Sequence, residues 1–325
     1  NISCCVAIWV LKSNLEDDMG KLVISYDCDG VWGMLDKLDS LDKAIFNRKS
    51  IVGIYKKIIS LHEAYQIQAT FAFVGAFAST KSDFDDVRKD YQKAIAINNW
   101  CANLDSLGCK FSEKDIHIPE LVDMVKLSKV DHEIASHGYS HVIMDKDFDE
   151  LSLECELEGI KKFSDSKNLN ISTLIFPRNV INYKFLEKAD YIDGFRAQPK
   201  QIASHKIIKR AFSLLKEFWP FCRSENIKMH DAKTIIPGEF FINWRSGLRR
   251  FVPIWLTIFR FRMALNHACN HDGIVHIWSH PHNLLTGKDQ LKLLSGMLSV
   301  VNEYRSNGSL KVLTQKDCVF RRNNL

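Results

Sequence analysis

No run of about 18 consecutive apolar residues, the length that a transmembrane helix needs, occurs in this chain. We therefore expect no segment to span a bilayer. The Cys-x-x-Cys pair is also absent, although the chain has nine cysteines. Because nine is an odd number and the cysteines are scattered, we expect neither a cysteine zinc module nor a disulfide framework. Free thiols are typical of a reducing cytosol, so the sequence predicts a cytoplasmic protein.

An excess of charge of one sign is missing as well. The chain has 44 Lys and Arg against 39 Asp and Glu, so its net charge is 44 − 39 = +5 over 325 residues. This surplus is too weak to indicate a nucleic-acid partner. Hydrophobic residues make up 46% and charged residues 26% of the chain, which is typical of a globular protein. The length permits one large α/β barrel or two modest domains.

The sequence has no Pro/Gly/Ser-rich linker, no low-complexity run and no solenoid repeat. Short β-rich runs instead alternate with stretches of helical spacing. This alternation predicts a parallel sheet or a (β/α) barrel. The seven predicted strands are 21–27, 68–74, 130–136, 172–176, 194–197, 273–279 and 310–314.

One domain over 19–325 is the simplest organisation. The stretch 200–270 is long for one βα unit, so we expect an insertion or elaborated helices there, including a basic amphipathic helix at 206–218. Residues 1–18 form a marginal segment, since a well-patterned start appears only at Met19. An added edge strand is an equally good interpretation of that segment.

In such folds, functional residues lie at the carboxyl ends of strands. The first predicted strand ends with Asp27 and Asp29, a pattern that on its own more often marks a solvated turn. His137 and His141 follow the third strand. Two histidines four apart can bind one ion if the segment forms a helical turn, and one carboxylate would complete the set. The alternative is two unrelated polar residues in a loop.

Two further strand ends carry polar chemistry. Arg178 follows the strand 172–176, where it could clamp a carboxylate or form a surface salt bridge. His280 ends the strand 273–279 and suits acid–base chemistry beside a metal. His276 lies deeper in that strand, and we expect it to be a hydrogen-bonded core residue. The joint occurrence of such residues at four strand ends favours one active site.

The sequence resembles the polysaccharide deacetylase family, also called the NodB-homology group or carbohydrate esterase family 4. The matching segments are SYDCDG at 25–30, HEIASHGYSH at 132–141 and HIWSHPHN at 276–283, with ATFAFVG at 69–75 similar to the second barrel strand. The resemblance runs from about Met19 to the end and is weakest over 200–270. It is closest to the divergent members of surface-polysaccharide biosynthesis, with Trp32-Gly33 after the acidic motif and FPRN in place of R-x-P-Y.

The resemblance implies a distorted (β/α) barrel of about seven parallel strands that binds one divalent metal, usually Zn²⁺. Asp29, His137 and His141 would be the metal ligands. Asp27 would be the general base and His280 the general acid. Arg178 would orient Asp27, although Pro and Arg stand in a different order from the family motif.

Substrate contacts are expected from residues beside these motifs: Trp32, Tyr139, Asn179 and Trp278. The aromatic rings suit sugar faces, but each could equally belong to the core. Five arginines flank the apolar run 251–261: Arg245, Arg249, Arg250, Arg260 and Arg262. They indicate either contact with a membrane surface or a phosphate, or the polar face of a barrel helix, which we slightly favour.

The expected function is removal of an N-acetyl or other acyl group from an amino sugar in polysaccharide or glycolipid biosynthesis. The substrate would be a nucleotide-, lipid- or oligosaccharide-linked sugar, with peripheral contact at the inner face of the membrane. Two alternatives stay open: a metal-free hydrolase of another C–N bond, such as a ring amide, and a non-catalytic protein that binds glycans.

Overall fold

The computed structural model describes residues 19–95, 103–145, 148–197, 217–219 and 224–319. The marginal segment 1–18 and nearly all of the predicted helix 206–218 lie outside these residues. Among the described helices, none is long and apolar enough to cross a membrane.

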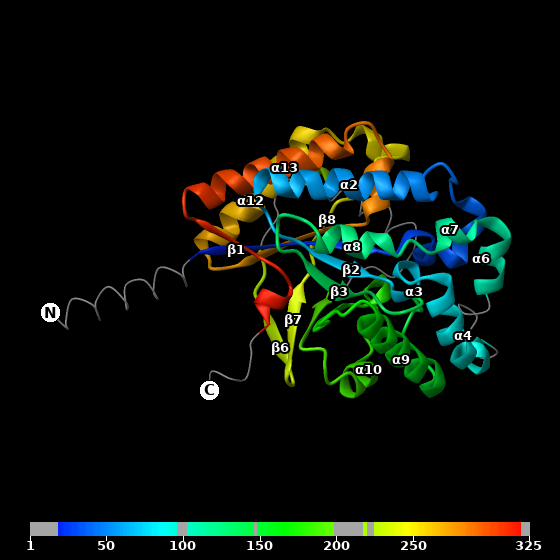
Figure 1. The fold of residues 1–325 in the computed structure, drawn as a ribbon. Coiled ribbons are helices and arrows are strands. Elements are labelled where there is room, and N and C mark those ends of the chain that lie inside the picture. Colours follow the sequence, from blue (N-terminus) through cyan, green and yellow to red (C-terminus); the bar gives the residue numbers. More distant parts are fainter. Residues whose placement is uncertain (1–18, 96–102, 146–147, 198–216, 220–223, 320–325) are drawn as a thin grey trace.

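One curled sheet organises the described residues (Figure 1). Its order is β6-β7-β5-β4-β3-β2-β1-β9-β8, with β10 also paired to β1. All pairs are parallel except β6 with β7. The strands are β1 (Gly20–Cys28), β2 (Thr70–Phe73), β3 (Glu133–Ser136), β4 (Thr173–Ile175), β5 (Gly194–Ala197), β6 (Lys228–His230), β7 (Lys233–Pro237), β8 (Phe240–Phe241), β9 (Ile274–Ser279) and β10 (Leu310–Leu313).

The sheet curls far enough for its two halves to meet. His276 on β9 hydrogen-bonds through Nδ1 to the carbonyl of Pro237 on β7 at 2.9 Å, and through Nε2 to Ser25 Oγ on β1 at 2.8 Å. His276 is therefore the hydrogen-bonded core residue that the sequence predicted. The result is a distorted, partly closed barrel, and all seven predicted strands are present in it.

Helices cover the outside of the sheet. The longer ones are α2 (Arg48–Tyr65), α4 (Lys81–Ile95), α9 (Glu150–Ser166), α12 (Ile254–Asn270) and α13 (Gln290–Ser306). The shorter α-helices are α3 (Gly75–Ala78), α6 (Leu104–Lys110), α7 (Glu113–Ile116), α8 (Glu120–Lys126) and α10 (Tyr183–Lys188). The 3₁₀ segments are η1 (Gly30–Ser40), η2 (Pro177–Asn179), η3 (Gly247–Phe251), η4 (Pro281–Leu285) and η5 (Lys316–Cys318).

Local sequence fixes the helix that packs beside the first strand. The side chain of Asn47 caps α2 by accepting a hydrogen bond from the Ser50 amide at 2.9 Å, and the helix ends at Gln66, whose φ is +51°. Between these ends, Ile51, Ile54 and Ile58 recur at helical spacing and are buried. In Figure 1, α2 lies with α12 and α13 on one side of the sheet.

The region 200–270 contains more strand than the sequence suggested. Within its described part, β6, β7 and β8 join the sheet, and only α12 matches a helix expected there. The residues of β6 are all exposed, and β8 has only two residues. Neither strand therefore shows the apolar alternation that predicts a strand from sequence. Each strand depends instead on its pairing with a neighbouring strand.

Candidate metal centre

A buried ion pair anchors one side of the site. Asp27, near the end of β1, accepts two hydrogen bonds from Arg196 on β5, from Nη1 at 2.7 Å and Nη2 at 2.6 Å. The Arg196 side chain is 0% exposed and that of Asp27 3% exposed. Burial alone would raise the pKa of Asp27, but the Arg196 guanidinium, helped by His137, holds it well below its usual value. Asp27 is therefore an ionised carboxylate in a buried setting.

The neighbouring carboxylate has a different environment. The closest imidazole nitrogens around Asp29 belong to His282 at 3.5 Å, His280 at 3.6 Å and His141 at 3.9 Å. Burial and the charge of Asp27 raise the pKa of Asp29 well above its usual value. A cation beside Asp29 would stabilise its ionised form, as Arg196 does for Asp27.

Gly33 leaves room for this carboxylate. A Cβ atom at position 33 would lie 1.9 Å from Asp29 Oδ2, which is far too short for two non-bonded atoms. The Trp-Gly sequence after the acidic motif therefore has a steric reason: the turn of η1 passes so close to Asp29 that any side chain at position 33 would displace the carboxylate.

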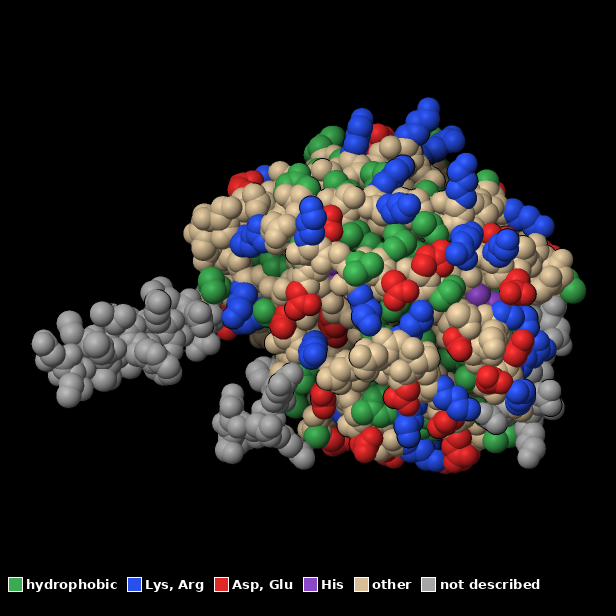
Figure 2. All heavy atoms as spheres, viewed as in Figure 1, with side chains coloured by type: hydrophobic (Ala, Val, Ile, Leu, Met, Phe, Trp, Pro, Cys, Tyr) green, Lys and Arg blue, Asp and Glu red, His purple; other side chains and the backbone are tan. Residues whose placement is uncertain are grey.

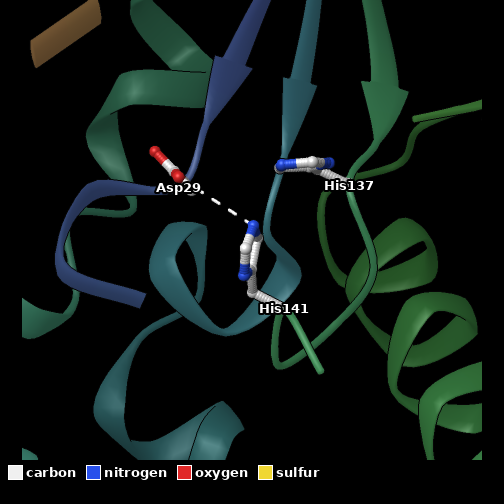
Figure 3. Close-up of side chains that lie close together, drawn as sticks. All are labelled: Asp29, His137 and His141. Atoms are coloured by element: carbon white, nitrogen blue, oxygen red, sulfur yellow. Dashed lines mark ion pairs between the residues drawn. The ribbon is translucent and has the colours of Figure 1, made fainter. Parts of the chain in front are cut away.

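The two histidines reach the site from one loop after β3 (Figure 3). The expected helical turn between them does not form. The loop instead reverses through Gly138 at φ +77° and His141 at φ +60°, which brings the two imidazole centroids to 4.8 Å. A left-handed backbone at a non-glycine residue is a strained conformation that persists where the surroundings enforce it.

Glu156 on α9 provides that enforcement. Its carboxylate is fully buried and accepts hydrogen bonds from the amides of Tyr139 at 2.7 Å and Ser140 at 3.0 Å, and from the Ser140 hydroxyl. These contacts fix the loop between the two histidines. The sequence analysis did not single out Glu156, since a glutamate in an amphipathic acidic helix carries no distinguishing signal.

Three residues fit a divalent metal. One ligand atom each from Asp29, His137 and His141 lies within 4.8 Å of the others, and all three residues are buried. His137 Nδ1 donates to the carbonyl of Ile175 at 2.7 Å, which leaves Nε2 as the lone-pair nitrogen. That Nε2 and Asp29 Oδ1 are buried with no hydrogen-bond partner among the described residues. Imidazole and carboxylate with this orientation form a donor set suited to Zn²⁺.

Two more histidines adjoin this cluster. His280, at the end of β9, is 22% exposed in its side chain, and burial lowers its pKa to about 4. The imidazole is therefore neutral near pH 7, so a general-acid role for His280 requires that it first take up a proton. His282 was not predicted, and burial holds its pKa well below its usual value. It follows His280 by two residues in the HPHN segment, which is the only signal that could have identified it.

The expected role of Arg178 needs correction. Arg178 forms an ion pair with Asp36 of η1, and the guanidinium on Asp27 is that of Arg196 instead. Asn179 also has a different position from the one expected. Its Oδ1 accepts hydrogen bonds from Arg196 Nε at 3.1 Å and Nη2 at 3.0 Å, so it holds the arginine that holds Asp27.

The three aromatic residues expected to contact a sugar are largely buried. Trp32 is 1% exposed and donates to the carbonyl of Ile116, and Tyr139 is 1% exposed against Gly75 and Gly159. Neither ring offers a face to a ligand, so both belong to the core alternative. Trp278 is 6% exposed and packs with its ring centroid 4.1 Å from the Arg196 guanidinium. It therefore supports the arginine.

No protein-family model matches the sequence, and no curated protein matches it. Solved structures do match. A protein from Mycobacterium smegmatis aligns at 13% identity with a TM-score of 0.57, covering 91% of this chain and 87% of that chain. A protein from Pseudomonas aeruginosa PAO1 aligns at 10% identity with a TM-score of 0.56, covering 93% of this chain and 90% of that chain. The names of both assign them provisionally to the polysaccharide deacetylases. The chain therefore has the NodB-type barrel fold of the polysaccharide deacetylases, as its motifs predicted.

Proposed function

We propose that this protein is a metal-dependent hydrolase that removes an N-acetyl or related acyl group from an amino sugar. One observation carries the proposal: an ionised, arginine-bound Asp27 lies beside a buried cluster of three residues that fit a divalent metal. His280 adjoins the same cluster. A base, a metal site and a proton donor at one end of a barrel form the set that amide hydrolysis requires.

Asp27 would act as the general base. Arg196 keeps it ionised despite its burial, so it can accept a proton from the water that attacks the acyl carbon. A divalent metal held by Asp29, His137 and His141 would supply Lewis acidity, which polarises the acyl carbonyl and makes water more acidic.

His280 would deliver a proton to the departing amine. Its side chain is partly exposed, and its Nδ1 lies 3.3 Å from Nδ2 of Asn283. Because its imidazole is neutral near pH 7, it must first take up a proton from solvent, to which its partly exposed side chain has access, and negative charge developing on the substrate would favour this uptake. Without this proton the C–N bond would break only with an amide anion as leaving group.

The substrate class and the compartment are part of the proposal. We infer a sugar that is linked to a nucleotide, a lipid or an oligosaccharide, used in the biosynthesis of a polysaccharide or glycolipid in the cytoplasm. The five free cysteines among the described residues, Cys28, Cys109, Cys155, Cys269 and Cys318, support a reducing compartment.

The test is acetate release from N-acetylated oligosaccharides, measured together with the metal content of the purified protein. Asp27→Asn should retain metal and lose kcat by about 100-fold or more, whereas His137→Ala should lose metal. The matched control is His230→Ala, since His230 is an exposed histidine of β6.

The two alternatives give different results in the same assay. Activity on a cyclic amide that survives metal removal would identify a metal-free hydrolase. Glycan binding without acetate release from any N-acylated sugar would identify a binding protein. Either outcome would overturn the proposed reaction.

A further inference from the structure

Exposed aromatic side chains are concentrated at the start of α12. Of the eleven large apolar side chains that are exposed among the described residues, five fall between positions 244 and 259. They are Trp244 at 40% exposure, Leu248 at 67%, Phe251 at 63%, Trp255 at 67% and Phe259 at 45%. We call these five side chains the aromatic surface. Exposed apolar side chains gathered in one place mark a contact with a protein or a membrane.

The aromatic surface extends along the chain from Trp244 through η3 into α12. The residues of η3 include none that is buried, and Arg245 folds back on this turn by donating to the carbonyl of Val252. Trp255 and Phe259 are four residues apart and so share one face of α12. The buried residues of the same helix, which include Phe261 and Leu265, pack on the barrel, so α12 has a second apolar face that the core does not use.

The segment that carries the aromatic surface is rich in arginine. Residues 240–271 contain five arginines and neither Asp nor Glu. Two of these arginines form ion pairs with acids outside the segment, Arg249 with Glu217 and Arg262 with Glu303. The Arg250 guanidinium lies 4.8 Å from the ring centroid of Phe251. Arginine beside exposed Trp and Phe is the composition that anionic lipid surfaces attract.

The aromatic surface is linked by hydrogen bonds to the segment that follows His280. The two neighbours of Trp244 make these bonds: Gln290 Nε2, at the start of α13, donates to the carbonyl of Asn243 at 2.7 Å, and the Arg245 amide donates to Oγ1 of Thr286, just after η4, at 3.1 Å. In Figure 2, Lys and Arg side chains predominate on the upper part of the visible face, where α2 and α13 lie, while Asp and Glu are more frequent in the lower half.

We propose that the aromatic surface docks this protein on an anionic phospholipid membrane. The ring faces of Phe251 and Trp255 enter the interface between headgroups and acyl chains, and Arg250 contacts lipid phosphates. Docking in this position puts the membrane beside the loop of His280. If the protein is the proposed deacylase, that position suits a substrate sugar that is carried on a lipid. This consequence rests on the proposed function, whereas the proposal that the protein docks on a membrane does not.

The experiment is co-sedimentation of the full chain with phosphatidylcholine vesicles, with and without phosphatidylglycerol. We expect binding to the vesicles that contain phosphatidylglycerol, weakened by salt. The double variant Phe251→Ser/Trp255→Ser should bind at least about tenfold more weakly, and Arg250→Glu should also bind more weakly. Leu127→Ser is the matched control, since Leu127 is an exposed apolar residue, 83% exposed, beyond the end of α8.

The outcomes separate the proposal from its competitors. Failure of the wild-type chain to bind anionic vesicles, or equal binding by the double variant, would overturn it. If light scattering shows a dimer that the double variant abolishes while no vesicle binding occurs, the aromatic surface is an interface between two copies. Circular dichroism confirms that each variant is folded. Because no substrate is used, the result is independent of acetate release.

Discussion

Replacement of Arg196 by Met tests the electrostatics of the site most severely. The substitution leaves Asp27 buried, with a side chain only 3% exposed, and removes both hydrogen bonds to its carboxylate. Removal of one partner from a buried pair typically costs about 3–5 kcal/mol of folding free energy. We therefore expect Arg196→Met to lower the free energy of unfolding by that amount near neutral pH.

The loss should depend on pH with a defined sign. In the wild type the pKa of Asp27 is below its unfolded value, so the stabilisation is present above about pH 4 and is lost as the pH falls further. In the variant the effect of burial is opposed only by His137 and His280, so the pKa of Asp27 rises. The unfolded chain then releases a proton that the folded chain keeps. Stability of the variant therefore falls by about 1.4 kcal/mol per pH unit above about pH 4, relative to the wild type.

The assay is urea unfolding of both proteins at about pH 4.5 and about pH 7, where the deficit of the variant should be smaller at the lower pH. Addition of Asp27→Asn to the variant should recover much of the loss at the higher pH. The reasoning is refuted if the deficit is the same at both pH values, or if the losses of the two single variants simply add.

Three further predictions concern other parts of the molecule. Gly33→Ala should displace the Asp29 carboxylate and abolish metal binding, measured by titration calorimetry. Gly53→Ala is the control and should bind metal normally, because nothing lies within 4 Å of its new Cβ. Equal metal affinities of the two variants would contradict the steric argument. Glu156→Gln should weaken metal binding by about 10- to 100-fold because it weakens the hydrogen bonds that fix the loop between His137 and His141. Unchanged affinity would show that this loop keeps its conformation without the Glu156 carboxylate. His62 is buried, which lowers its pKa from 6.5 to about 3, so the stability it contributes is present above pH 6.5 and is lost as the pH falls toward 3. His62→Gln should therefore reduce the pH dependence of the free energy of unfolding in this range by about 1.4 kcal/mol per pH unit, measured by urea unfolding. If that pH dependence is unchanged, groups other than His62 cause it.

The sequence predicted the strands that bury an apolar run. β1 carries Leu22, Val23 and Ile24 in succession, all buried, and such a run has few alternatives to an inner strand of a parallel sheet. The acids and histidines at the strand ends were then predicted to lie close together, because the carboxyl ends of parallel strands meet at one edge of the sheet. Asp29, His137 and His141 do gather there.

Arg196 was missed because it lies inside a strand rather than at its end. The segment Gly194–Ala197 contains an arginine in a run that the alternation marks as buried. A charged residue at such a position requires a partner of opposite charge across the barrel, and this requirement was the available signal. Arg178, which does follow a strand end, has a left-handed backbone with φ of +54° and pairs with Asp36 instead.

Tyr139 and Trp32 show a second limit of the sequence. Aromatic residues beside a catalytic motif are equally compatible with sugar contact and with the core, since composition does not determine which way a loop side chain points. Close approach of Gly75 and Gly159 to the Tyr139 ring decides the matter for that residue. Such packing depends on contacts between segments far apart in the chain.

Metal titration into the metal-stripped protein tests the central claim most directly. The account predicts that the wild type binds one equivalent of Zn²⁺, and that His137→Ala, which removes the one ligand nitrogen oriented by the Ile175 carbonyl, loses this binding. His276→Asn is the matched control, because His276 is equally buried but bonded to Ser25 and Pro237. One full equivalent of Zn²⁺ bound by His137→Ala with wild-type affinity would contradict the assignment of this site.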